Sequence, residues 1–183
     1  MLFPLNCIFY EKQMKAKDRI RLTGISNFKY YLSHFLGYAI LELMIILPGF
    51  LFSKYILNIN WGQNSIICLL GIETLACFSV IIGIFLGAKL NSKDKVEPII
   101  TSLMIPIFSF LGGSYIKLDN DLNGFFGVIT NLSPLRWINK ALMTYIYENS
   151  SQLIFEVIAV FVGLIVLGLF ITTRVADKEE LSL

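Results

Sequence analysis

Residues 65–88 read SIICLLGIETLACFSVIIGIFLGA, an apolar run that a single charged residue, Glu73, interrupts. An α-helix rises about 1.5 Å per residue, so about 20 apolar residues are enough to cross the hydrocarbon core of a bilayer. A run of this length predicts a transmembrane helix rather than a buried helix of a soluble domain. This stretch therefore places the chain among membrane proteins.

Three further segments, 30–56, 98–116 and 153–173, have the same character. Together the four segments predict an all-α fold, a polytopic bundle of four transmembrane helices. Composition agrees, because 56% of the 183 residues are hydrophobic and 15% are charged, against roughly 25% charged in soluble domains. The net charge of +2 is too small for a surface that binds nucleic acid.

The first ten residues, MLFPLNCIFY, are apolar but too few to cross a bilayer. They lack a basic leading region and a small-residue cleavage site, which argues against a signal peptide. We interpret 1–10 as the end of a transmembrane helix whose beginning is missing. Residues 11–29 form a basic block and predict a cytoplasmic connecting helix. The remainder, 30–183, is then the transmembrane domain.

Lysines and arginines set the predicted orientation, since cytoplasmic loops of membrane proteins are enriched in them. Of the 15 basic residues, eleven fall on the side of the basic block, of the loop after the second span and of the C-terminal tail. The four on the other side are Lys54, Lys117, Arg136 and Lys140. This imbalance predicts a multi-pass protein with a cytoplasmic C-terminus.

Between the third and fourth spans, 121–147 carries apolar residues at helical spacing. Asp121 is a candidate cap for a first short helix, and Ser133-Pro134 begins a second. Arg136 is expected to point away from the apolar face of this second helix. The pattern predicts an outer helix pair, interfacial or re-entrant. A packing role and a role in gating are both open.

Glu42 and Glu73 fall near the middle of their predicted spans. Intramembrane charges are costly and often mark a pathway. One interpretation is a cation or proton site, or a polar lining of a substrate path. The other is a pair of protonated carboxyls that hydrogen-bond between helices.

Motifs of catalysis and cofactor binding are missing from the sequence. There is no GxxxxGK[ST] loop for nucleotide phosphates and no GxSxG nucleophile. The single histidine, His34, suits a structural hydrogen bond near the inner interface, and no metal or cofactor is expected on this chain. Three cysteines without a CxxC pair are interpreted as free thiols in apolar segments. Gly83 and Gly87 form a GxxxG motif, which permits close helix packing within one bundle or in a dimer.

Three stretches together resemble the ABC-2 type permeases, the membrane subunits of ABC exporters with the type V fold. The first is Glu11-Lys12 followed by KDRIRLTGISNFKYYLSHFL, 17–36, which is similar to the family's connecting helix. The others are LGGSYIKLD, 111–119, and NLSPLRWINKALMTYIY, 131–147. The Gly-Ile-Ser turn is closest to the lipid-exporter branch. Lys15-Ala16 departs from the Gly-Thr of many members.

The resemblance implies a six-span protein of which this chain is the C-terminal part, either a fragment or a split subunit. It implies a partner ABC ATPase that binds ATP and Mg, a second permease half in a homo- or heterodimer, and contact with membrane lipid. The chain itself would be no enzyme. Its place would be the cell (plasma) membrane, and its cargo a drug, peptide, lipid or ion.

The resemblance also implies roles for particular residues. Residues expected to couple to the ATPase are Lys17, Asp18, Arg19, Arg21, Gly24 and Ser26. Glu42 and Glu73 would line the translocation pathway, and Pro134 and Trp137 would belong to the outer gate. Two rival interpretations are a small multi-pass immunity or assembly protein without transport, and a non-functional permease remnant. A membrane-embedded enzyme is the weakest alternative, because no nucleophile and base converge.

Overall fold

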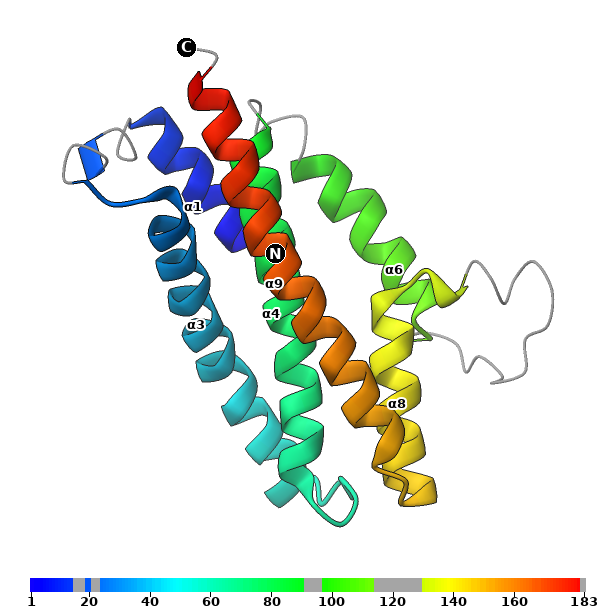
Figure 1. The fold of residues 1–183 in the computed structure, drawn as a ribbon. Coiled ribbons are helices and arrows are strands. Elements are labelled where there is room, and N and C mark those ends of the chain that lie inside the picture. The colour runs from blue at the N-terminus through cyan, green and yellow to red at the C-terminus, as the bar shows by residue number, and fades with distance from the viewer. Residues whose placement is uncertain (15–18, 21–23, 91–96, 114–129, 182–183) are drawn as a thin grey trace. The chain divides into compact units, whose positions relative to one another are not determined.

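The computed structural model describes residues 1–14, 19–20, 24–90, 97–113 and 130–181, with side chains to residue 177. Within these ranges every regular element is a helix (Figure 1). Three helices are long and apolar enough to cross a membrane: α3 (Asn27–Tyr55), α4 (Ser65–Lys89) and α9 (Gln152–Leu181). The described part is therefore an all-helical membrane protein.

The start of α3 is fixed by a turn and a cap. Gly24 has φ +78°, a left-handed conformation that glycine adopts without a steric penalty. Ser26 follows, and its Oγ accepts the backbone N–H of Lys29 at 3.4 Å. The cap draws Asn27, Phe28 and Lys29 into the first turn, so α3 begins before the apolar run itself.

The third predicted span is shorter in the structure than in the sequence pattern. Its helix runs from Glu97 to Leu111 and contains a π-helix, Ile100–Met104, before α6 (Ile105–Leu111). Pro106 lacks the N–H that an α-helix would donate to the preceding turn, and the π-turn lies at that point. Residues 114–116 lie outside the described ranges, so a fourth crossing stays a prediction.

The chain divides into two compact units. The first comprises 1–45, 76–97 and 162–183, and the second comprises 46–75 and 98–161. The core of the first unit unites α1 (Leu2–Gln13) with parts of α3, α4 and α9. Its buried residues are Ile8, Tyr30, Tyr31, Tyr38, Val80, Ile84, Ala88 and Ala176.

The GxxxG motif of α4 holds α1. A Cβ atom built on Gly87 would lie 2.9 Å from Ile8 Cβ, and one on Gly83 would overlap the carbonyl group of Met1. Lys12 Nζ adds a hydrogen bond to the carbonyl oxygen of Ala88 at 3.3 Å. The glycines therefore let two helices of the same bundle approach closely, which is one of the two alternatives left open by the sequence.

We expect Gly87→Ala to weaken the packing of α1. The added methyl group cannot be placed without moving α1, and overpacking of this kind costs about 1–3 kcal/mol. The matched control is Gly163→Ala on α9, whose Cβ position has no atom within 4 Å and which gains helix propensity. Thermal unfolding in detergent, followed by circular dichroism, should show a lower Tm for Gly87→Ala than for Gly163→Ala. Equal Tm values would contradict the close packing of α1 against Gly87.

Candidate functional site

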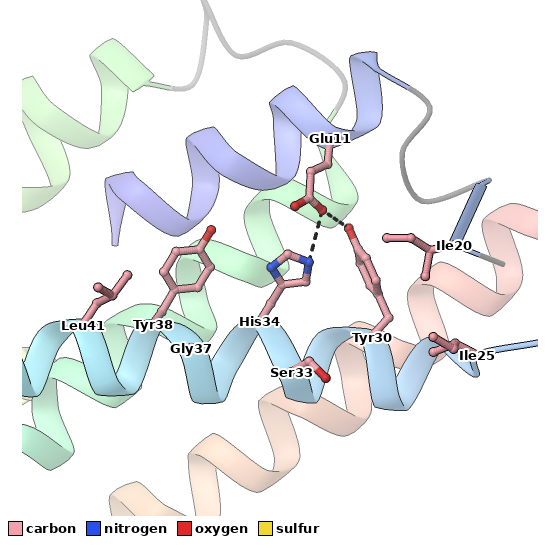
Figure 2. A pocket seen from close by; sticks show the side chains of 9 residues that line it. All are labelled: Glu11, Ile20, Ile25, Tyr30, Ser33, His34, Gly37, Tyr38 and Leu41. Atoms are coloured by element: carbon pink, nitrogen blue, oxygen red, sulfur yellow. Dashed lines mark hydrogen bonds and ion pairs between the residues drawn. The ribbon is translucent and has the colours of Figure 1, made fainter. Parts of the chain in front are cut away.

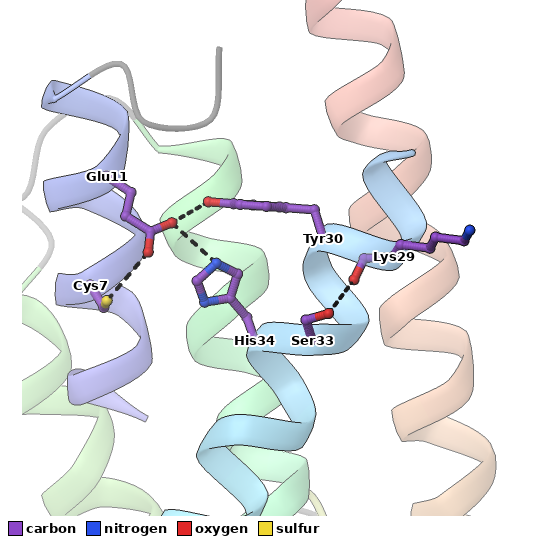
Figure 3. Close-up of polar contacts among 6 residues, drawn as sticks. All are labelled: Cys7, Glu11, Lys29, Tyr30, Ser33 and His34. Carbon is purple, nitrogen blue, oxygen red and sulfur yellow. Dashed lines mark hydrogen bonds and ion pairs between the residues drawn. The ribbon is translucent and has the colours of Figure 1, made fainter. Parts of the chain in front are cut away.

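A carboxylate on α1, Glu11, joins α1 to the first turns of α3 (Figure 3). One of its oxygens, Oε2, accepts a hydrogen bond from the Tyr30 hydroxyl and lies 3.1 Å from His34 Nε2. The other, Oε1, is 3.8 Å from the thiol of Cys7. We call these contacts between Glu11 and the first turns of α3 the Glu11 joint. The joint is partly shielded from water, because the Glu11 and His34 side chains are 22% and 19% exposed. His34 thus has the hydrogen-bonding role expected from the sequence.

The spacing along α3 explains why these side chains meet. Tyr30, His34, Tyr38 and Glu42 follow one another at four-residue intervals, so they form a stripe along one side of the helix. Ring centroids of Tyr30 and His34 are 4.6 Å apart, and those of His34 and Tyr38 are 6.1 Å apart. The four-residue spacing of this stripe is visible in the sequence, but it matches no metal-binding or catalytic motif and so was not predicted as a site.

Beside this joint lies a cavity of about 450 Å³ (Figure 2). It begins at Ile20 and Ile25, in the segment between α1 and α3 (the connecting segment), and runs along α3 towards the middle of that helix. Its lining residues are Glu11, Ile20, Ile25, Tyr30, Ser33, His34, Gly37, Tyr38 and Leu41. Apolar walls with a few polar groups are typical of small-molecule sites. Across the described ranges, no group of three or more His, Cys, Asp or Glu residues is arranged to hold a metal ion.

The predicted coupling residues are described only in part. Arg19 is exposed, Gly24 makes the left-handed turn and Ser26 caps α3. The other three, Lys17, Asp18 and Arg21, lie outside the described ranges. Next to the cap, Asn27 Nδ2 donates a hydrogen bond to Asp177 Oδ1 of α9 at 2.7 Å. The beginning of α3 is therefore attached to α9 as well as to α1.

The two predicted pathway residues belong to different units. Glu42, in the first unit, is half-buried one turn beyond Tyr38 and interacts electrostatically with the Met1 end of α1. Glu73, in the second unit, is half-buried on α4. Each is an acidic group within a helix of membrane-spanning length. A pathway role for either residue stays a prediction.

The second helix of the predicted outer pair is α8 (Pro134–Glu148). It packs against α6 through side chains that donate to the carbonyl oxygens of that helix end. Ser133 Oγ donates to Phe108 O at 2.9 Å, and Asn139 Nδ2 donates to Gly112 O at 2.8 Å. Pro134 is half-buried in the first turn, and Trp137 is 41% exposed. Residues 121–129, the first helix of the pair, lie outside the described ranges.

Arg136 differs from its expected position. It is only 8% exposed, although its spacing from the apolar residues placed it on the outer side of the helix. Ser133, Arg136 and Asn139 recur every three residues and so share the side of α8 that meets α6. Ser133 and Asn139 donate to carbonyl oxygens at the end of α6 from this side.

We expect Tyr30→Phe to destabilise the joint between α1 and α3. Glu11 would lose one donor, and hydrogen bonds to charged groups contribute about 1.5–3 kcal/mol. The control is Tyr10→Phe, at an exposed tyrosine next to Glu11 in sequence. Thermal unfolding of the single variants and of Tyr30→Phe combined with Glu11→Gln forms a double-mutant cycle. Additive losses of stability would show that the contact contributes nothing.

Comparison with known proteins places the chain in a family. The family described as ABC-2 family transporter protein matches residues 1–173. No curated protein and no solved structure matches the chain. The family match covers α1, α3 and α4 completely and α9 as far as residue 173, so the region that carries the Glu11 joint is part of it. On this match, the chain belongs to the ABC-2 family of transporter membrane proteins.

Proposed function

We propose that the chain is the membrane-spanning permease part of an ABC-2 exporter and that a separate ABC ATPase drives it. Family membership supports the permease role, and membrane subunits of this family are generally not catalytic themselves. ATP and Mg would bind the partner subunit. The observation that carries the proposal is that both ends of the connecting segment are held by contacts with α3.

One end of the segment follows α1, where Glu11 holds Tyr30 and His34 of α3. The other end is the Gly24 turn and the Ser26 cap, where α3 begins. A displacement of the Gly24 turn would act on the first turn of α3 through the Ser26 cap. This is the arrangement that a docking lever for an ATPase requires, with Lys17, Asp18, Arg19, Arg21, Gly24 and Ser26 as the coupling residues.

The proposal extends to the rest of the transporter. Glu42 and Glu73 would line the pathway, and a second permease half would complete it. The outer helix pair around 121–147 would shape the outer gate, with Pro134 and Trp137 of α8 as gate residues. The hydrogen bonds from Ser133 and Asn139 support this, because they make α6 and α8 a joined pair. The chain would lie in the plasma membrane, and a cytoplasmic C-terminus agrees with the distribution of basic residues.

We expect the chain to co-purify with an ATPase that carries a P-loop. Affinity-tagged chain is expressed with the ATPase of a neighbouring reading frame, and the ATPase retained on the resin is quantified. Arg19→Glu should reduce retention several-fold, whereas Arg174→Glu, at another exposed basic residue, should not. Failure to retain any such ATPase would favour the immunity or assembly protein or the permease remnant.

A second prediction concerns the acidic residues within the helices. Glu42→Gln and Glu73→Gln keep the side-chain volume and remove the charge, so we expect reduced ATP-dependent transport without loss of folding. The control is Glu156→Gln at an exposed acidic residue of α9. Transport is measured in proteoliposomes that contain the assembled transporter, alongside the Tm of each variant. Full transport by the double variant would exclude a pathway role for the charges.

A further inference from the structure

The cavity beside the Glu11 joint combines a carboxylate with aromatic walls. The donors to Glu11 are a phenol, an imidazole and a thiol, and none of these groups carries a permanent positive charge. The carboxylate is 22% exposed, so it is partly desolvated and still reachable from the cavity. Charges in such surroundings are screened less than those on an open surface.

The remaining walls suit a flat or bulky apolar group. Tyr30 and Tyr38 line the cavity on the side of α3, and Ile25 and Leu41 lie near its two ends (Figure 2). Aromatic faces attract cations through the ring quadrupole, most strongly where water is excluded. A ligand that fits both the carboxylate and these walls has a cationic centre on an apolar body.

We propose that this cavity binds an amphiphilic organic cation. The cationic centre lies near Glu11, and the apolar body extends along Tyr38 towards Leu41. If the chain is part of an exporter, as proposed above, such cations would be the substrate class of that exporter, and only this step rests on the proposed function. Binding by itself needs no ATPase.

The charges around the cavity favour a cation over an anion. An anion would approach the partly desolvated carboxylate of Glu11, and like charges at short range repel. The basic residues next in sequence to lining residues in the described ranges, Lys12, Arg19 and Lys29, are exposed to solvent. Their fields are therefore weakened by water and salt. An anionic lipid would instead need basic side chains that line the cavity itself.

Gly37 provides a steric test that spares the fold. It lines the cavity and is exposed, and no atom lies within 4 Å of its Cβ position. A Cβ atom at this position meets no protein atom, and a larger side chain built on it would extend from the cavity wall. Gly163 on α9 is a matched control, because it is also exposed and helical and has nothing within 4 Å of its Cβ position.

The experiment is equilibrium dialysis of the purified full chain in a neutral detergent. The probes are tetraphenylphosphonium and tetraphenylborate, which have the same shape and opposite charge. We expect saturable binding of tetraphenylphosphonium and none of tetraphenylborate. Gly37→Leu and Glu11→Gln should each weaken binding by about tenfold or more, whereas Gly163→Leu should leave it unchanged. Glu11→Asp, which keeps the charge, should restore part of the affinity.

Three results would overturn the inference. The first is equal binding of the two probes, and the second is unchanged affinity in Gly37→Leu. The third is displacement of the probe by phosphatidylglycerol but not by excess unlabelled phosphonium, which would assign the cavity to anionic lipid. Retention of the ATPase by the tagged chain is a separate measurement. Its failure would leave cation binding intact, and loss of cation binding would leave ATPase retention intact.

Discussion

An apolar chain must satisfy its shielded polar groups within the protein, because lipid offers no hydrogen-bond partners. In the first unit this constraint acts on Glu11. Its carboxylate accepts from Tyr30 and His34, and those contacts exist only because α1 lies close to α3 and α4. The close approach in turn depends on Gly83 and Gly87, whose missing side chains leave room for the backbone of α1. The Glu11 joint and the cavity beside it therefore both depend on the close packing of α1 against Gly83 and Gly87.

The same constraint shapes the second unit. At the end of α6 the carbonyl oxygen of Phe108 accepts the backbone N–H of Gly112 at 2.8 Å and has a second lone pair for a further donor. Ser133 and Asn139 supply donors to Phe108 and Gly112, and Arg136 is buried on the same side of α8. Polar side chains that would normally face water therefore face a helix end. The amphipathic pattern of α8 identifies a helix correctly but does not identify which neighbour each side meets.

Local patterns predicted the membrane-protein class and the long helices. The apolar run at 65–88 became α4 with almost the same limits, and α3 begins at a serine cap, Ser26, a residue type favoured at that position. Contacts between distant segments were beyond such patterns. The pairing of Glu11 with His34 depends on where α1 docks. Composition alone did not reveal that the third apolar helix ends at Leu111 or that it contains a π-turn before Pro106. Burial of Arg136 follows from the packing of α8 against the rest of its unit, which no spacing rule within α8 reveals.

The hydrogen bond between Asn27 and Asp177 connects the start of α3 to the far end of α9. Helix α9 continues to Leu181, beyond its apolar part. A helix of fixed apolar length tilts when the bilayer becomes thinner and stands more upright when it thickens. Tilting of α9 would move Asp177 sideways and pull on Asn27, next to the connecting segment. The start of α3 is thus joined to a helix whose tilt would follow the thickness of the surrounding bilayer.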